Sequence, residues 1–340
     1  MKLAVVLFNL GGPDSPETVE PFLFNLFRDP AILALPDFLR RPLARFIAHR
    51  RAPVAAEIYA KIGGRSPILE ETLAQGRALE RALGKHETRA FVAMRYSKPF
   101  GDDAARDVAA WAPDRIVLLP LYPQFSKTTS GSSFKDWQRA AAAAGITVPQ
   151  SRVCCYPWQS GFVESLAELT RETVAKARPE MSYRYLLSAH GLPERIVASG
   201  DPYRWQVERT AAALVERLGI EDWTICYQSR VGPLKWIGPP TDGEIRRAGA
   251  EGKGVVVVPI SFVSEHSETL VEPDIDYRML AREAGVRDYL RVPAVGVRAP
   301  FIAGLARLVL QSLEQREPVT CGDGRICPAM HKACGYAQEP

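Results

Sequence analysis

The alternation of short apolar runs with longer amphipathic stretches constrains the fold of this chain more than any other feature. Its clearest example is Val255–Val258, an unbroken run of β-branched residues between Gly254 and Pro259. Such a run is typical of a strand buried on both faces, and its alternation with helices indicates a parallel sheet covered by helices. The predicted strands are Lys2–Phe8, Thr88–Met94, Arg115–Pro120, Tyr185–Ser188, Trp223–Tyr227, Val255–Ile260 and Tyr289–Val292.

The first helix is predicted to start at Ser15 and Pro16, which are a favourable N-cap and a favourable first helical residue. The apolar side chains that follow recur at helical spacing and form one face, namely Val19, Phe22, Leu23, Leu26 and Phe27. Phe24 lies off this face and adds apolar surface where solvent would be expected. Two further helices are predicted at Pro202–Leu218 and Pro300–Glu314.

The two halves of the chain carry similar motifs at their predicted strand ends, in the same order. The matched pairs are Asn9–Pro13 with Ala189–Pro193, Arg95–Pro99 with Gln228–Pro233, and Leu118–Pro120 with Val257–Pro259. We therefore predict the α/β class, with two similar doubly wound, Rossmann-like domains that each contain a four-stranded type of parallel sheet.

The predicted domains are residues 1–150 and 151–315, followed by a cysteine-rich tail at 316–340. In doubly wound sheets, ligands bind beyond the carboxyl ends of the strands, where all of the matched motifs lie. A cleft between the two halves is therefore the expected binding site.

The composition is that of an ordinary globular protein, because 46% of the residues are hydrophobic and 24% are charged. The net charge of +4 is mild, and no Lys/Arg run is interleaved with stacking aromatic residues, so no nucleic-acid partner is predicted. No run approaches the ~20 apolar residues that span a bilayer, and the apolar N-terminal stretch is too short for a signal peptide. We expect a cytoplasmic protein, with a peripheral contact at the inner membrane as an alternative. The densest basic cluster, at residues 40–51, suits either a solvated helix face or an anionic surface.

One candidate chemical residue is His190, which follows an apolar strand and precedes a Gly-Leu-Pro turn. A neutral imidazole can accept a proton near neutral pH or bind iron, although a histidine here could also simply satisfy nearby backbone groups. A second candidate is the acidic run that contains Glu265, Glu268 and Glu272. If Glu265 begins a helix, Glu268 and Glu272 lie on one face, where carboxylates can escort a divalent cation or relay protons. The alternative is an acidic helix N-terminus without a function.

The hydroxyl-rich loop Tyr122–Ser133 could bind phosphate or carboxylate, but it lacks the Walker pattern. The segment Asn9–Pro13 lacks the third glycine of a dinucleotide-binding fingerprint. A nucleotide-binding function is therefore excluded.

Taken together, these motifs resemble ferrochelatase in matching order over nearly all of residues 1–315. The resembling segments are Asn9–Pro13, Tyr59–Pro67, Met94–Tyr96, Tyr122–Ser133, Ser188–Pro193, Gln228–Pro239 and Ser261–Leu270. The resemblance implies a chelatase-like fold and a lyase that inserts ferrous iron into protoporphyrin IX to form protoheme, the last step of heme biosynthesis. The helix after Pro16 matches the apolar lip of this family, and this lip favours protoporphyrin IX over the more charged coproporphyrin III.

The resemblance also implies roles for individual residues. His190 and Glu268 match the catalytic pair and, with His266 and Glu272, candidate metal ligands; Asp276 continues the acidic path. The porphyrin-binding residues are matched by Leu10, Tyr59, Ser66, Arg95, Tyr96 and Trp236. The helix after Pro16 matches the apolar lip, so Phe24 is expected to be exposed for a membrane or a partner. Arg65 departs from the family pattern, where many relatives have glycine.

The tail carries three cysteines, with five residues between Cys321 and Cys327 and six between Cys327 and Cys334. Three thiolates need a fourth ligand to hold either a 2Fe–2S cluster or zinc. Cys154 or Cys155 could supply it, with Cys155 slightly preferred, whereas His331 would favour zinc, and ordinary thiols in a disordered tail are a further alternative. Some ferrochelatases carry a C-terminal cluster with one distant cysteine ligand, so the resemblance favours 2Fe–2S.

Two other functions fit parts of the sequence. Cobalt insertion into sirohydrochlorin uses a related fold but commonly a pair of histidines, whereas this chain pairs His190 with Glu268. A porphyrin-binding protein without catalytic activity would need Trp236 and the apolar lip but not the acidic row. Porphyrin and ferrous iron therefore remain the predicted partners.

Overall fold

A computed structural model of the chain describes residues 1–230, 232 and 234–337. Val231, Pro233 and the last three residues of the predicted tail lie outside the described residues. Contacts divide the chain into two compact units. The first unit contains residues 1–155, 305–326 and 335–340, and the second contains residues 156–304 and 327–334.

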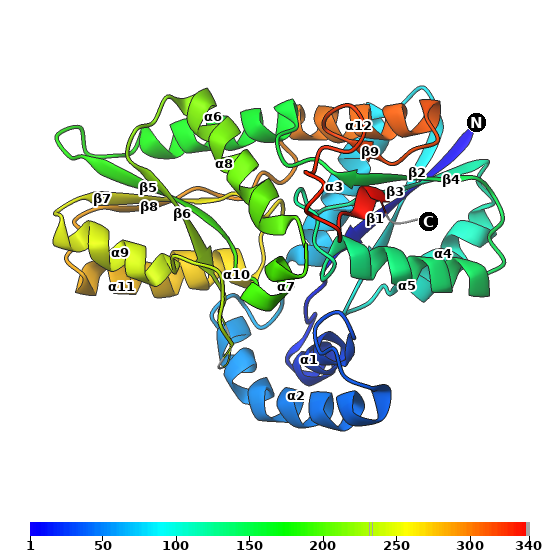
Figure 1. Ribbon diagram of the computed structural model, residues 1–340, viewed down its shortest axis with the longest axis horizontal. Helices are drawn as coiled ribbons and strands as arrows, with labels where there is room; N and C mark the ends of the chain where they lie inside the picture. Colours follow the sequence, from blue (N-terminus) through cyan, green and yellow to red (C-terminus); the bar gives the residue numbers. More distant parts are fainter. Residues whose placement is uncertain (231, 233, 338–340) are drawn as a thin grey trace. The chain divides into compact units, whose positions relative to one another are not determined.

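The first unit is built on a parallel five-stranded sheet in the order β2-β1-β3-β4-β9. Its strands are β1 (Lys2–Asn9), β2 (Glu87–Met94), β3 (Arg115–Pro120), β4 (Gln150–Cys155) and β9 (Val319–Thr320). Leu3 to Val6 of the central strand β1 are fully buried because helices cover both faces of the sheet. Figure 1 shows α4 and α5 on one face and α3 and α12 on the other. These helices are α3 (Ile68–Ala82), α4 (Gly101–Trp111), α5 (Ser130–Ala143) and α12 (Ala299–Glu314).

Between β1 and β2, the chain forms a helical excursion. It consists of the 3₁₀ turn η1 (Pro16–Thr18), α1 (Val19–Arg28) and α2 (Asp37–Ala60). The predicted apolar face of α1 packs on α2. We predicted that Phe24 is exposed, but it is only partly accessible. Its ring is partly buried, and the guanidinium groups of Arg28 and Arg45 each lie 5.6 Å from its centroid. The two cations shield this off-face ring from water.

The second unit is built on a parallel four-stranded sheet in the order β6-β5-β7-β8. Its strands are β5 (Tyr183–His190), β6 (Trp223–Gln228), β7 (Gly254–Pro259) and β8 (Tyr289–Arg291). Helices α6 and α8 cover one face, and α9 and α11 cover the other (Figure 1). Its helices are α6 (Ser160–Val174), α7 (Glu194–Ala198), α8 (Tyr203–Leu218), α9 (Thr241–Ala250), α10 (Ser267–Leu270), the π-helical turn η2 (Glu272–Asp276) and α11 (Tyr277–Glu283). The residues Val255–Val258 of β7 are fully buried, as their sequence predicts.

The predicted fold class, two doubly wound α/β sheets, is confirmed. The first sheet has one strand more than the four-stranded type that we predicted, and β4 and β9 were not predicted at all. The predicted division falls after residue 150, whereas the contacts change unit after Cys155, at the end of β4. The tail contributes residues to both units.

Candidate active site

The carboxyl ends of three neighbouring strands in the second unit carry the principal candidate residues. His190 ends β5 and Gln228 ends β6, and these two residues face each other in the parallel register. On the other side of β5, the chain leaves β7 at Pro259 and reaches Glu268 in the short helix α10. The strand order therefore brings segments that are far apart in sequence to one edge of the sheet.

The backbone and ring of His190 are both held in place. Its N–H donates to Ser261 Oγ at 3.1 Å, and its carbonyl accepts from the Tyr203 hydroxyl at 3.0 Å. The ring atom Nδ1 lies 2.6 Å from the carbonyl oxygen of Gly191. Because a carbonyl only accepts, Nδ1 carries a proton, and Nε2 is the atom that points toward the acidic segment.

Glu268 lies between two histidines. Its Oε1 is 3.5 Å from His190 Nε2, and its Oε2 is 3.6 Å from His266 Nε2. The Nδ1 atom of His266 lies 3.1 Å from the carbonyl of Ser264, so this ring is oriented in the same manner as His190. The two imidazoles and one carboxylate form a continuous row across which a proton can move.

The charge of this pair is set by two opposing effects. Burial disfavours the imidazolium form of His190, but the neighbouring Glu268 carboxylate outweighs it and raises the pKa of His190 to about 9 from 6.5. Burial likewise opposes the charge of Glu268, but His190 and His266 lower the pKa of Glu268 well below its ordinary value. The stabilisation from the His190–Glu268 ion pair is fully present below pH 6.5 and disappears as pH rises through about 9.

A Glu268→Gln substitution should return the titration of His190 toward the ordinary value of 6.5, because the amide carries no charge to hold the proton. NMR of the histidine ring protons measures this directly, since the chain has five histidines. The matched control is Glu20→Gln, which changes a carboxylate 3.4 Å from the exposed His49 and should leave His190 unaffected. An unchanged His190 titration in Glu268→Gln would contradict the assigned pairing.

Glu272 is surrounded by hydrogen-bond donors. Its Oε1 accepts from the Ser229 N–H at 2.9 Å and from the Tyr277 hydroxyl at 2.6 Å. Its Oε2 accepts from Ser229 Oγ at 2.6 Å and from Gln228 Nε2 at 3.3 Å. Ser229 has a φ of 60°, in the left-handed region that non-glycine residues rarely adopt. Glu272 therefore holds the backbone that follows β6 in an unfavourable conformation.

The predicted helix face shared by Glu268 and Glu272 does not form. Glu265 precedes the helix, where it accepts a hydrogen bond from Arg291 at 2.8 Å, and α10 begins at Ser267. The π-helical turn η2 then begins at Glu272, so that its carboxylate faces Ser229 and Tyr277 while Glu268 faces the histidines. Proline at position 273 cannot donate to an α-helical ladder, which explains why the α-helix does not continue.

Trp236 lies beside the histidine turn. It forms an isolated antiparallel bridge with Pro193, and its ring atom Cε3 would lie 3.3 Å from a Cβ at Gly191, so glycine is required there for close approach. Its indole Nε1 is buried and lacks a hydrogen-bond partner within the described part of the chain. The indole N–H is thus available to an acceptor on a bound molecule.

In the first unit, the predicted residues Leu10, Tyr59 and Tyr96 gather in one apolar cluster with α1 and α2. The backbone N–H of Tyr96 donates to the carbonyl of Leu10 at 3.0 Å. Ser66 is held against the loop after β1, because its backbone N–H donates to the carbonyl of Pro13. The approach is close, since a Cβ added at Gly12 would lie 2.6 Å from Ser66 Cβ.

Sequence reasoning missed Asp29, the buried anchor of Arg95 and Tyr96. Its Oδ2 lies 2.9 Å from Arg95 Nη2 and accepts from the Tyr96 hydroxyl at 2.9 Å, and it also accepts from Ser132. Arg95 Nε donates to Ser132 Oγ at 2.7 Å, which closes the network. Burial, reinforced by Asp29, raises the pKa of Tyr96 well above its ordinary value, so this phenol remains a donor. Asp29 precedes Pro30, and this pattern is typical of the end of a helix. It does not indicate the distant partners of Asp29.

Comparison with known proteins shows the family of the chain. The ferrochelatase family model matches residues 2–313. The chain belongs to the ferrochelatase family. A ferrochelatase from Phenylobacterium zucineum is 57% identical over 98% of each chain, and one from Caulobacter vibrioides is 53% identical over 98% of this chain and 94% of its own length. Ferrochelatases are enzymes of heme synthesis that insert iron into porphyrin, and the predicted enzyme class is thereby confirmed.

Solved structures support the same fold for this ferrochelatase. The sirohydrochlorin chelatase SirB from Bacillus subtilis superimposes with a TM-score of 0.55 over 93% of this chain and 97% of its own, at 10% identity. SirB with Fe³⁺ gives a TM-score of 0.52 over 92% and 96% of the two chains, at 13% identity. At this identity the likeness concerns the fold, and it confirms the predicted chelatase-like architecture.

The cysteines of the ferrochelatase chain are distributed over both units. Cys154 and Cys155 end β4, and β9, which pairs with β4, leads directly into Cys321 within the same unit. Cys327 and Cys334 belong to the second unit, where Cys327 Sγ accepts a hydrogen bond from Gln206 Nε2 at 3.1 Å. Within the residues that the structure describes, no group of three or more His, Cys, Asp or Glu side chains is arranged to hold a metal ion.

Proposed function

We propose that this ferrochelatase inserts ferrous iron into protoporphyrin IX to form protoheme. The observation that carries the proposal is the carboxylate of Glu268 held between His190 Nε2 and His266 Nε2, at 3.5 and 3.6 Å. Metal insertion needs a group that removes the inner pyrrole protons and a route by which they leave. A histidine that touches a carboxylate, which touches a second histidine, supplies both.

His190 accepts a pyrrole proton at Nε2 when that nitrogen is unprotonated, and the ionised Glu268 beside it stabilises the imidazolium that forms. His266 lies on the other side of Glu268 and takes the proton onward, so His190 returns to a state that can accept again. The bond from Nδ1 to Gly191 keeps the ring of His190 from turning during transfer. Since imidazole and carboxylate groups are both ligands for divalent iron, we propose that His190 and Glu268, with His266 and Glu272 nearby, guide Fe²⁺ to the ring.

The flat porphyrin must bend so that its nitrogen lone pairs point out of the ring plane toward the metal. Such distortion costs ~1–5 kcal/mol, which contacts elsewhere on the substrate offset. Trp236 offers a ring face and an indole N–H beside His190, and we assign Leu10, Tyr59, Ser66, Arg95 and Tyr96 to porphyrin binding in the first unit. Arg95 suits a propionate, because its guanidinium is pre-oriented by Asp29 and Ser132.

The decisive assay is anaerobic insertion of Fe²⁺, run side by side with protoporphyrin IX and coproporphyrin III. We expect faster product formation with protoporphyrin IX. A preference for coproporphyrin III would reassign the substrate, and insertion of cobalt into sirohydrochlorin with no product from either porphyrin would reassign the enzyme. Porphyrin binding without any metal insertion would overturn the catalytic proposal.

We propose that the tail cysteines hold a 2Fe–2S cluster together with Cys154 or Cys155. The proposal is supported by the position of Cys321, which follows β9, the strand that pairs with β4, and β4 ends in Cys154 and Cys155. The amide hydrogen bond from Gln206 to the Cys327 sulfur is the kind that stabilises a thiolate ligand. His331, the alternative ligand that would favour zinc, has its ring 5.9 Å from that of Trp205.

Protein purified under anaerobic conditions should contain acid-labile sulfide and show the visible absorbance of the cluster. Cys321→Ser should lose both, and separate Cys154→Ser and Cys155→Ser variants should identify the fourth ligand by which one loses them. Cys226→Ser is the matched control, because this buried thiol, whose pKa burial raises to about 12, lies in β6 of the second unit. Bound zinc without labile sulfide would contradict the cluster.

We also propose a peripheral contact between α2 and an anionic membrane. The buried residues of α2 are Ala44, Ala48 and Tyr59, whereas three large apolar side chains of this helix point outward: Phe38, Phe46 and Val54 are 74%, 63% and 60% exposed. Arginines of the same helix, including the exposed Arg41 and Arg45, would meet lipid phosphates. No helix in the described residues is long and apolar enough to cross a membrane.

A double Phe38→Ser/Phe46→Ser variant should bind phosphatidylglycerol vesicles at least about tenfold more weakly than wild type in a sedimentation assay, since each ring loses apolar contact with lipid. Leu73→Ser, at a 41% exposed position on α3, is the matched control and should bind as wild type does. Equal binding by the double variant would exclude α2 as the contact.

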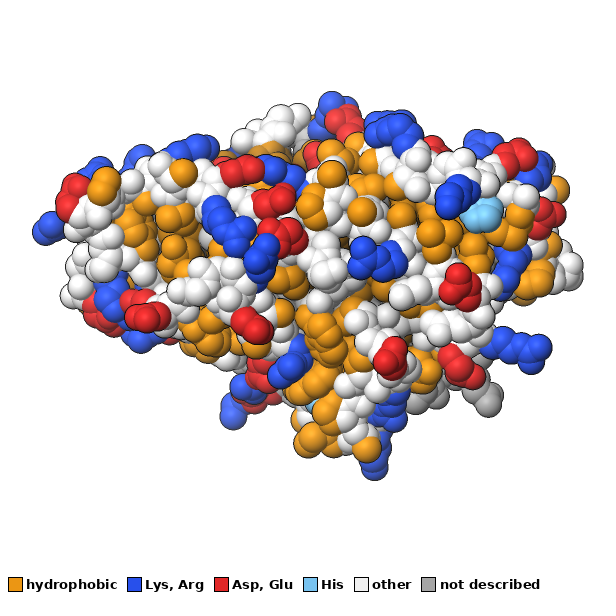
Figure 2. Space-filling model, turned by 90° about the horizontal axis from the view of Figure 1, so that it is seen from above, with side chains coloured by type: hydrophobic (Ala, Val, Ile, Leu, Met, Phe, Trp, Pro, Cys, Tyr) orange, Lys and Arg blue, Asp and Glu red, His pale blue; other side chains and the backbone are white. Residues whose placement is uncertain are grey.

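We propose no nucleic-acid partner, because basic and acidic side chains are interspersed on the face drawn in Figure 2.

A further inference from the structure

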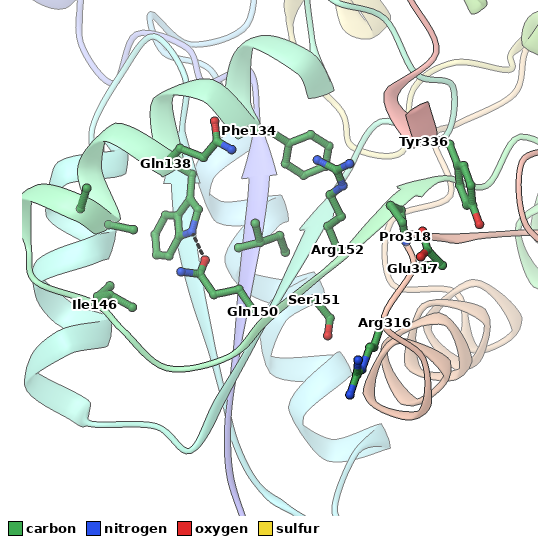
Figure 3. Close-up of a pocket in the computed structure, with 14 residues that line it drawn as sticks. Phe134, Gln138, Ile146, Gln150, Ser151, Arg152, Arg316, Glu317, Pro318 and Tyr336 are labelled. Carbon is green, nitrogen blue, oxygen red and sulfur yellow. Dashed lines mark hydrogen bonds between the residues drawn. The ribbon is translucent and has the colours of Figure 1, made fainter. Parts of the chain in front are cut away.

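The first unit contains a recess of about 680 Å³ that neither the iron-insertion residues nor the apolar cluster of α1 and α2 occupies. It lies over the face of β3 and β4, beside the second half of α5 (Figure 3). The volume falls within the ~300–1,000 Å³ typical of small-molecule sites.

The inner wall of the recess is apolar and aromatic. Phe134, Trp137 and Ala141 of α5 line it, together with Leu118 of β3 and Ile146. The polar edge of the indole is already satisfied, because Trp137 Nε1 donates to Gln150 Oε1 at 2.8 Å (Figure 3). Trp137 is 1% exposed and Phe134 is 8% exposed, so the apolar surface that the wall offers to a ligand comes from the accessible part of Phe134 and from Ile146 and Ala142.

The outer part of the recess is cationic. Arg152 lies with its guanidinium 5.9 Å from the centroid of Phe134, and Arg316 lines the recess from the other side (Figure 3). Glu317 supplies one negative charge against these two positive charges. Burial lowers the pKa of Arg152 and the nearby Cys154 and Glu317 raise it, and the guanidinium remains protonated, so the recess keeps a net positive charge that favours an anion.

We propose that this recess binds a small amphipathic monocarboxylate, with its ring against Phe134 and Ile146 and its carboxylate at Arg152. The chemical class follows from an aromatic inner wall that ends at a single partly buried arginine. Both ends of the cysteine tail contribute to the wall, Pro318 just before β9 and Tyr336 just after Cys334. The ligand therefore also contacts the segments that carry the tail.

The experiment uses the full chain and 1-naphthoate as probe, with the uncharged 1-naphthamide for comparison. We expect saturable binding of naphthoate with a Kd below about 1 mM by ligand-observed NMR, and clearly weaker binding of naphthamide. Saturating porphyrin should not displace naphthoate. Equal binding of both probes, displacement by porphyrin, or binding that does not saturate would each overturn the proposal.

Two variants test the location. Arg152→Gln should weaken naphthoate binding by ~10–100-fold, because it removes a charge-assisted hydrogen bond. Ala142→Phe, at an exposed position of α5 that lines the recess, should fill it and also reduce binding without disturbing the core. Arg106→Gln, whose side chain is 68% exposed and outside the recess, is the matched control. Wild-type affinity in both variants would place the probe elsewhere and overturn the proposal.

Discussion

His190→Ala is expected to lower kcat for iron insertion by at least about 100-fold while porphyrin affinity changes little. The imidazole of His190 lies 3.5 Å from the carboxylate of Glu268. Among the described side chains of the second unit, only His190 and His266 combine a fixed Nδ1–H with an Nε2 that faces this carboxylate. Steady-state insertion of Fe²⁺ and equilibrium porphyrin binding, measured on the same preparation, separate the two quantities.

His49→Ala is the control for this experiment, because its side chain is 76% exposed and it belongs to α2. This control should retain wild-type turnover. Glu268→Gln should also lose turnover, since the proton row is interrupted between His190 and His266. Full turnover of His190→Ala at the same iron and porphyrin concentrations would contradict the assignment of His190 as the proton acceptor.

Glu272→Ala is expected to destabilise the protein by about 2–4 kcal/mol and to raise KM for porphyrin, because four donors lose their acceptor. The left-handed backbone of Ser229 then lacks the carboxylate that holds it. Displacement of this segment would spread to Gly191, whose N–H donates to the carbonyl of Gln228 at 2.9 Å, and so to the histidine turn. Urea unfolding midpoints and substrate kinetics measure the two effects.

The outcome distinguishes a positioning residue from a metal escort. If Glu272 only conducts iron, Glu272→Ala raises KM for Fe²⁺ and leaves stability and porphyrin KM unchanged. If it positions the loop, Ser229→Gly introduced into Glu272→Ala should recover part of the stability, because glycine adopts the left-handed conformation without strain. Glu283→Ala, an exposed acid of α11, controls for the loss of one charge.

The sequence predicted the strands of both sheets except β4 and β9. The core strands β1 and β7 are continuous apolar runs, and both were placed within a residue or two of their ends. The strand β4 begins with the polar residues Gln150, Ser151 and Arg152, and only its last three residues are buried, so its pattern is too short to recognise. The strand β9 has two residues and exists only because β4 pairs with it.

In the candidate site, the residues at strand ends were predictable and their partners were not. His190 and Glu268 were predicted from motifs, and their 3.5 Å separation follows from the strand order. Asp29 and Tyr277 act through contacts that depend on tertiary packing, as with the bond from Tyr277 to Glu272. Local patterns carry no information about such distant partners, and they do not indicate the π-helical turn that begins at Glu272 either.

The short strand β9 has a consequence for any shortened form of this chain. A protein that ended at residue 315 would lack Val319 and Thr320, and the N–H and C=O groups of Val153 to Cys155 would face water along an open sheet edge. Open edges of this kind recruit strands from other molecules. We therefore expect such a shortened chain to associate with itself more readily than the full chain, whatever the neighbouring cysteines bind.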